Sequence, residues 1–157
     1  MEKNNHIFYY ACNPYQNGSI IYMVMDMKIS TRGRYALIIM INLALNDTVM
    51  SLKDIADKEN LPLKYLEKIM RLLVNAKLVK SIRGKDGGYI LIKKPNEYSI
   101  GEILRASEGN LESRACDTDN CDKQNTCPTI KFFDGLYKEI NEYVDKKKLS
   151  DIIKEVK

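Results

Sequence analysis

The 157 residues include 45% hydrophobic and 29% charged side chains, a balance that fits a globular chain with one core and excludes a wholly disordered one. The longest apolar run, at 35–45, is too short to span a bilayer. With a single histidine and no phosphate-binding loop or nucleophile motif, the composition argues against an enzyme. The net charge is +4, but residues 61–94 alone carry nine basic and two acidic side chains, a net charge of +7. Such a concentration attracts a nucleic-acid backbone, although a solvated lysine face is the alternative.

The N-terminal part of the chain predicts an irregular segment followed by three helices. Residues 1–26 show no sustained period, and the segment from Met27 reads like a protein start, so 1–26 are either a genuine extension or a misassigned start. Apolar residues at three- and four-residue spacing predict a helix over 31–45, capped by Ser30 or Thr31. A short helix follows Ser51 and closes at Asn60, and a third helix has Pro62 in its first turn.

The periodicity then changes to that of a hairpin. Strands at 78–82 and 89–92 flank Arg83-Gly84-Lys85-Asp86-Gly87-Gly88, where Asp-Gly-Gly is expected to supply the positive φ of a tight turn. Ser99 caps a helix ending near Gly109, and a polar loop leads to a long helix over about 128–148 and a short one at 149–156. The long helix has an apolar stripe that must pack on its own domain or on a second copy of the chain, and it consists of Phe133, Leu136, Tyr137, Ile140 and Val144.

Three helices followed by a basic hairpin predict a mainly α fold with a small β-hairpin wing, the winged helix-turn-helix. In that fold the third helix enters the major groove of DNA and the hairpin reaches phosphate or the minor groove. The exposed face of the third helix is expected to carry Lys64, Glu67, Lys68 and Arg71, with Arg83 on the wing. The alternative is a helical interaction domain that does not bind DNA.

Three cysteines in the polar loop are the second chemical signal. Cys116 and Cys121 are separated by four residues, and Cys121 and Cys127 by five. Their odd number argues against a disulfide framework. Soft thiolates in a short loop suit an iron–sulfur cluster or zinc with a fourth ligand from elsewhere, and redox-sensitive thiols remain a third interpretation. Cys12 is interpreted as incidental.

Four stretches resemble the Rrf-two family of IscR-like bacterial regulators. They are KISTRGRYAL at 28–37, SLKDIADKENLPLKYLEKI at 51–69, LVKSIRGKDGGYIL at 78–91 and SIGEILRASEG at 99–109. The resemblance runs from Met27 to about Lys154. It implies a cytoplasmic transcriptional regulator, expected to be a repressor, that binds palindromic double-stranded DNA as a homodimer with a long crossing helix as the interface.

The resemblance also divides the chain and assigns contacts. It implies an extension at 1–26, a DNA-binding domain at 27–108, a cysteine loop at 109–127, and a dimerisation helix and tail at 128–157. Base contacts are expected from Pro62, Lys64 and Glu67, and a minor-groove contact from Arg83. The full set of expected DNA contacts is Lys28, Arg32, Tyr35, Ser51, Pro62, Lys64, Tyr65, Glu67, Lys68, Arg71, Arg83 and Lys85.

In many members of the family the cysteines hold a 2Fe–2S or 4Fe–4S cluster, so Cys116, Cys121 and Cys127 are the expected ligands, and a 2Fe–2S cluster is favoured. Two departures leave the fourth ligand open: Ile130 stands at the position of the family's histidine ligand, and Phe133 replaces a usual tryptophan. A loop carboxylate, a residue of the partner subunit or an exogenous thiol would fill the place. The alternatives are a clusterless regulator controlled by thiol oxidation or a protein partner, and a zinc-stabilised interaction module.

Overall fold

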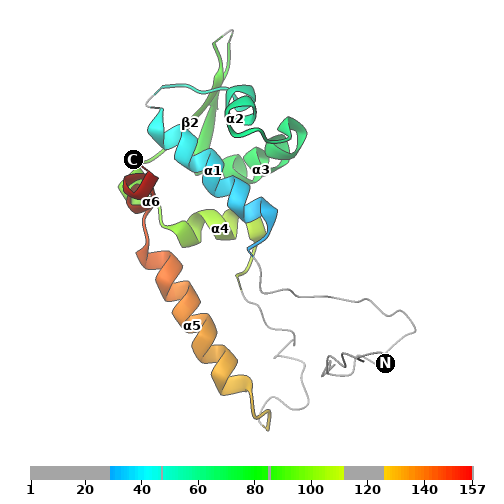
Figure 1. Cartoon of the computed structure of the whole chain (residues 1–157), viewed down its shortest axis with the longest axis vertical. Helices are drawn as coiled ribbons and strands as arrows, with labels where there is room; N and C mark the ends of the chain where they lie inside the picture. The colour runs from blue at the N-terminus through cyan, green and yellow to red at the C-terminus, as the bar shows by residue number, and fades with distance from the viewer. Residues whose placement is uncertain (1–28, 47, 85, 112–125, 157) are drawn as a thin grey trace, which may run out of the picture.

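A computed structural model of the chain describes residues 29–46, 48–84, 86–111 and 126–156. Helices α1 (Thr31–Leu45), α2 (Leu52–Glu59) and α3 (Leu63–Asn75) precede a hairpin of β1 (Val79–Ile82) and β2 (Gly88–Leu91). The 3-10 helix η1 (Pro95–Glu97) then leads to α4 (Ile100–Glu108), α5 (Ile130–Lys146) and α6 (Leu149–Val156). The hairpin projects from one end of the helical body and α5 extends away from the other (Figure 1). The predicted fold class, mainly α with a hairpin wing, is confirmed.

Serine side chains set the starts of three helices. Ser30, Ser51 and Ser99 each accept a hydrogen bond from a backbone N–H in the first turn of α1, α2 and α4. Such a cap satisfies one of the amides that a helix start leaves without a partner. Pro62 differs slightly from expectation: α3 begins at Leu63, and Pro62 precedes it as the capping residue, with its carbonyl accepting from the N–H groups of Tyr65 and Leu66.

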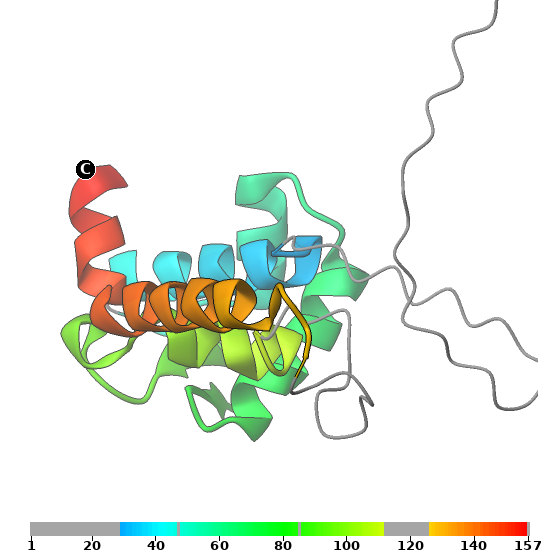
Figure 2. The same ribbon diagram turned by 90° about the horizontal axis from the view of Figure 1, so that it is seen from below.

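One hydrophobic core joins the first four helices to the last one. Ile39 of α1, Ile55 of α2 and Ile69 of α3 are fully buried, as is Ile103 of α4. Leu149 of α6 belongs to the same core, so the C-terminal helix folds back onto the body. Helix α4 packs against both α1 and α5. Seen from below, α5 runs across the front of the body, with α1 and α4 behind it (Figure 2). Burial of these side chains is the main source of stability for the fold.

The turn of the hairpin corrects one expectation. Positive φ occurs at Gly84 (128°) and not in the Asp-Gly-Gly sequence. Gly87 and Gly88 are required for a different reason, close backbone approach. A Cβ on Gly87 would lie 2.5 Å from the Ile82 carbonyl oxygen, and one on Gly88 would clash with the Met50 backbone. This close approach lets Met50 pair with Tyr89 through two backbone hydrogen bonds of 2.9 and 3.1 Å, which fixes the wing to the segment before α2.

Tyr98 holds the base of the wing. Its side chain is fully buried, and its hydroxyl donates to the Leu78 carbonyl oxygen at 2.7 Å. The hydroxyl oxygen of Tyr98 also accepts from the N–H groups of Ile92 at 2.9 Å and Lys93 at 2.8 Å. Because Leu78 directly precedes β1 and Ile92 directly follows β2, one phenol ties both ends of the hairpin to the segment before α4.

Helix α5 is shorter at each end than the expected 128–148, and its apolar stripe is only partly covered. Tyr137 and Val144 are buried, and Arg105 of α4 holds the C-terminal half of α5 through Asn141 (2.9 Å) and Asp145. Towards its start, Phe132 is 67% exposed and Phe133 41% exposed. Among the described residues, none of the helices is both long and apolar enough to cross a membrane.

Candidate nucleic-acid interface

The outer face of α3 is polar and open to solvent. Leu66, Ile69, Met70 and Leu73 face the core, while Lys64, Lys68 and Arg71 are exposed. Lys64 has a side-chain exposure of 90% and lies 3.5 Å from the Glu67 carboxylate. Exposed ion pairs of this kind contribute little to stability, so both groups are available to a partner at small cost.

An aromatic contact fixes the first turn of α3 against α1. The rings of Tyr35 and Tyr65 meet edge to face, with centroids 5.7 Å apart and an interplanar angle of 76°. Both side chains are half-buried. Residues three apart in a helix share a face, so Arg32 lies on the same side of α1 as Tyr35. The start of α1 therefore lies beside the start of α3. Ser51 lies before α2, where its side chain accepts from the N–H of Asp54 at 3.1 Å.

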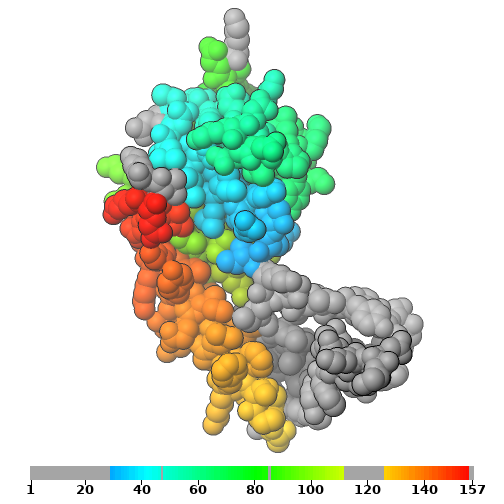
Figure 3. Space-filling model, viewed as in Figure 1, coloured from blue at the N-terminus to red at the C-terminus, as the bar shows by residue number. Residues whose placement is uncertain are grey.

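The wing adds a second exposed basic element. Arg83 follows the last residue of β1 and is exposed, and Lys80 within β1 is also exposed. The wing stands clear of the body in the space-filling view (Figure 3). Of the expected DNA contacts, Lys28 and Lys85 lie outside the described residues.

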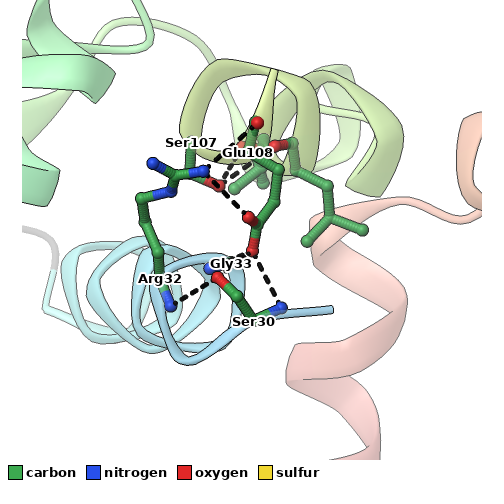
Figure 4. Close-up of polar contacts among 7 residues, drawn as sticks. Ser30, Arg32, Gly33, Ser107 and Glu108 are labelled. Carbon is green, nitrogen blue, oxygen red and sulfur yellow. Dashed lines mark hydrogen bonds and ion pairs between the residues drawn. The ribbon is translucent and has the colours of Figure 1, made fainter. Parts of the chain in front are cut away.

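Glu108, the last residue of α4, organises the start of α1 (Figure 4). Its Oε1 accepts from the Ser30 hydroxyl (2.6 Å), the Ser30 N–H (3.0 Å) and the Gly33 N–H (2.7 Å). Nη2 of Arg32 donates at 3.2 Å both to Oε2 and to the backbone carbonyl oxygen of Glu108. Burial opposes ionisation of the Glu108 carboxyl, but the hydrogen bonds from Ser30, Gly33 and Arg32 outweigh burial and lower its pKa below the ordinary value.

Sequence reasoning identified Arg32 but missed Glu108. The two residues are 76 positions apart, and no local pattern links the end of one helix to the start of another. The glycine in Arg32-Gly33-Arg34 is the nearest signal. A Cβ at Gly33 would lie 2.5 Å from Oε1 of Glu108, so only glycine accommodates the carboxylate at this distance.

Of the three loop cysteines, only Cys127 lies within the described residues. Its thiol is half-buried, and Sγ lies 3.3 Å from Oγ1 of Thr129. Ile130, the first residue of α5, has an aliphatic side chain and offers no metal ligand. Cys116 and Cys121 fall outside the described ranges, and within those ranges no group of three or more side chains is arranged to hold a metal ion.

Three helices with an exposed cationic recognition face, followed by a basic hairpin, define a winged-helix DNA-binding regulator. A family model described as "Rrf2: Iron-dependent Transcriptional regulator" matches residues 29–155. The chain belongs to this Rrf2 (Rrf-two) family, as the resemblance predicted. The family and the relatives below are transcriptional regulators, which confirms that the chain is not an enzyme.

Named relatives include regulators of two kinds. The transcriptional regulator CymR of Bacillus subtilis is 52% identical over 87 residues, 54% of this chain and 63% of that protein. Its structure, described as that of the global cysteine regulator, has a TM-score of 0.68 at 37% identity and covers 81% of this chain and 96% of that one. IscR of Aliivibrio salmonicida is 31% identical, covering 81% of this chain and 77% of that protein. The structure of T. potens IscR has a TM-score of 0.69 at 35% identity, and it covers 85% of this chain and 90% of that one.

Proposed function

We propose that the chain is a sequence-specific transcriptional repressor that binds a palindromic operator as a homodimer in the cytoplasm. The observation that carries this proposal is the exposure of cationic side chains on α3 and on the wing that follows it, namely Lys64, Lys68, Arg71 and Arg83. Lysine and arginine side chains that neutralise phosphates release counterions and supply affinity, and contacts to base edges supply specificity.

The proposed division of roles follows position on the surface. Pro62, Lys64 and Glu67 stand at the start of α3, the part of a recognition helix that contacts base edges. Lys64 suits guanine, and the Glu67 carboxylate accepts from the cytosine amino group. Arg83 extends into the minor groove. Phosphate contacts come from the rest of the surface, and this set consists of Lys28, Arg32, Tyr35, Ser51, Tyr65, Lys68, Arg71 and Lys85.

The proposed dimer uses α5. Phe132 and Phe133 near its start and Tyr143 near its end are exposed, at 67%, 41% and 64%, on a helix that extends from the body (Figure 3). Exposed apolar patches of this kind mark interfaces. Two copies packed through α5 about a two-fold axis would present two α3 helices to half-sites about one helical turn of DNA apart, or a multiple of it.

The proposed cofactor is an iron–sulfur cluster, 2Fe–2S in preference to 4Fe–4S, bound by Cys116, Cys121 and Cys127. The support is the donor set, since three thiolates suit iron, together with the family's description as iron-dependent. The aliphatic Ile130 at the start of α5 leaves the fourth ligand to another group. Bound there, the cluster would respond to oxidants and to the availability of iron and sulfur, and its state would modulate DNA affinity.

DNA binding is tested with matched pairs of charge removals. K64Q/R83Q removes two exposed charges from the proposed surface, and K138Q/K146Q removes two exposed charges from α5, where the lysine side chains are 74% and 77% exposed. We expect the first variant to lose roughly tenfold or more in affinity for a duplex enriched by the wild-type chain from a random library, and the second to bind like wild type. Equal affinities for the two variants would refute the proposed surface.

The cofactor is tested by iron, sulfide and zinc analysis of anaerobically purified protein, with C116A/C121A/C127A compared with C12A. We expect iron and labile sulfide in wild type and C12A and neither in the triple variant. Zinc without sulfide would favour a zinc site, and a protein without metal would favour a clusterless regulator. Either result would refute the cluster and leave the DNA-binding proposal to its own test.

A further inference from the structure

We infer that Glu108 is a positioning residue for DNA binding: it fixes Arg32 so that the outward edge of the guanidinium meets a DNA phosphate. The inference rests on the proposed function, because it concerns how one expected phosphate contact is held in place. Glu108 itself is not a DNA contact. Its side chain is only 13% exposed, whereas that of Arg32 is 43% exposed.

The contacts of Arg32 divide its guanidinium into a held edge and an open edge. Nη2 is bound twice by Glu108, and Nε is buried without a hydrogen-bond partner in the described part of the chain. The third nitrogen of the guanidinium, Nη1, points away from Glu108 in Figure 4. A planar arginine fixed on one edge has less freedom to lose when the other edge binds a phosphate.

The carboxylate is itself fixed, which makes it a rigid support. Oε1 is occupied by three donors from the start of α1, two from Ser30 and one from Gly33, and Oε2 receives Arg32. The two oxygens therefore have separate tasks, since one caps α1 and the other anchors the arginine. The absence of a side chain at Gly33 permits this arrangement.

The neighbouring residues place Arg32 beside the recognition helix. Tyr35, one turn further along the same face of α1, packs on Tyr65 in the first turn of α3. An arginine held at this point flanks the groove that α3 would enter. The opposite role, in which Glu108 competes with phosphate for Arg32, predicts the opposite sign of effect in the experiment below.

Glu108→Gln separates the two tasks of the carboxylate. Its amide oxygen can still accept from Ser30 and Gly33, which turns its NH2 group towards Arg32 and removes the side-chain acceptor for the guanidinium, leaving only the backbone carbonyl oxygen of residue 108. Arg32→Ala and the double variant complete a cycle, in which residues that act together give non-additive effects. The control is Glu102→Gln on the same helix, which removes an ion pair of 2.8 Å with Lys93.

Affinity for the duplex enriched by the wild-type chain is measured over a range of salt concentrations. We expect R32A to weaken binding about tenfold and to reduce the salt slope by roughly 0.9 for each phosphate that the variant no longer neutralises. E108Q should produce most of that reduction in salt slope, and E102Q should leave the slope unchanged. Adding E108Q to R32A should change neither the affinity nor the slope further. A merely structural role would lower the thermal midpoint of E108Q without reducing the salt slope.

Three results would overturn the inference. These are tighter binding by E108Q, an equal loss of affinity from E108Q with or without R32A, and a wild-type salt slope in E108Q. Ser30→Ala guards against a folding artefact. It removes the hydroxyl that accepts from the Arg32 N–H and donates to Oε1, but keeps the Ser30 and Gly33 N–H donors to Oε1 and the Arg32 pair, so it should lower the thermal midpoint and reduce the salt slope less than E108Q does. A wild-type chain without salt-dependent binding would instead refute the proposed function.

Discussion

Tyr98→Phe should destabilise the protein by removing one buried oxygen. The hydroxyl serves three backbone groups at the base of the wing, those of Leu78, Ile92 and Lys93. Phenylalanine keeps the ring, including its contact with the Lys93 ammonium 5.3 Å from the ring centroid. The substitution therefore tests the hydrogen bonds apart from packing.

The magnitude follows from which backbone groups lose their partner. A buried polar group left unsatisfied costs about 1–3 kcal/mol. The Ile92 N–H also donates to the Leu78 carbonyl oxygen at 3.4 Å, so these two groups keep a hydrogen bond to each other in the variant. Lys93 is an exposed residue whose N–H can reach water. We therefore expect the free energy of unfolding to fall by about 2 kcal/mol, less than the sum for three orphaned groups.

Urea unfolding at fixed protein concentration measures this loss of stability. For a slope of about 2 kcal/mol per M, the midpoint should fall by roughly 1 M. Tyr143→Phe makes the same chemical change at a side chain that is 64% exposed and keeps the ring that α5 offers to the proposed interface, so its stability should stay within about 0.5 kcal/mol of wild type. Equal midpoints for the two variants would refute the claim that Tyr98 anchors the wing.

Three further predictions follow from single features of the structure. Gly88→Ala should lower the free energy of unfolding by about 1–3 kcal/mol, because the added Cβ clashes with backbone. Gly135→Ala, in α5 with open space around it, should raise the free energy of unfolding by about 0.5–1 kcal/mol, and urea unfolding measures both changes. Because the folded pKa of Glu108 is below its ordinary 4.5, its ionisation stabilises the protein above that pH, so the stability gap between wild type and E108Q should narrow as pH falls from 5 to 3. F132S/F133S should shift the chain from dimer to monomer in light scattering, and an unchanged mass would contradict the α5 interface.

Local signals in the sequence predicted the helices well. Helix α1 spans the expected 31–45, and Ser51 and Asn60 border α2 as expected, because caps and periodicity are properties of neighbouring residues. The turn chemistry was predicted less well. Gly87 and Gly88 are constrained by Ile82 and Met50 backbone atoms, and contacts of this kind depend on how the hairpin packs.

The candidate site also contains residues that local sequence signals placed correctly and residues that they missed. The exposed face of α3 follows from its period of burial, so Lys64, Lys68 and Arg71 could be placed from the sequence. Glu108 could not, since its partners come from a helix start 75 to 78 residues earlier. Periodicity also left open what packs on the apolar stripe of α5. It indicates that one face of a helix is apolar, but not which surface buries that face.

The proposed DNA-binding surface is tested most directly by the dependence of DNA affinity on salt for the unmodified chain. If α3 and the wing of a dimer neutralise about six to ten phosphates, log affinity should fall against log salt with a slope of roughly −5 to −9. A duplex affinity that stays constant across the same salt range would show that α3 and the wing do not bind the phosphate backbone.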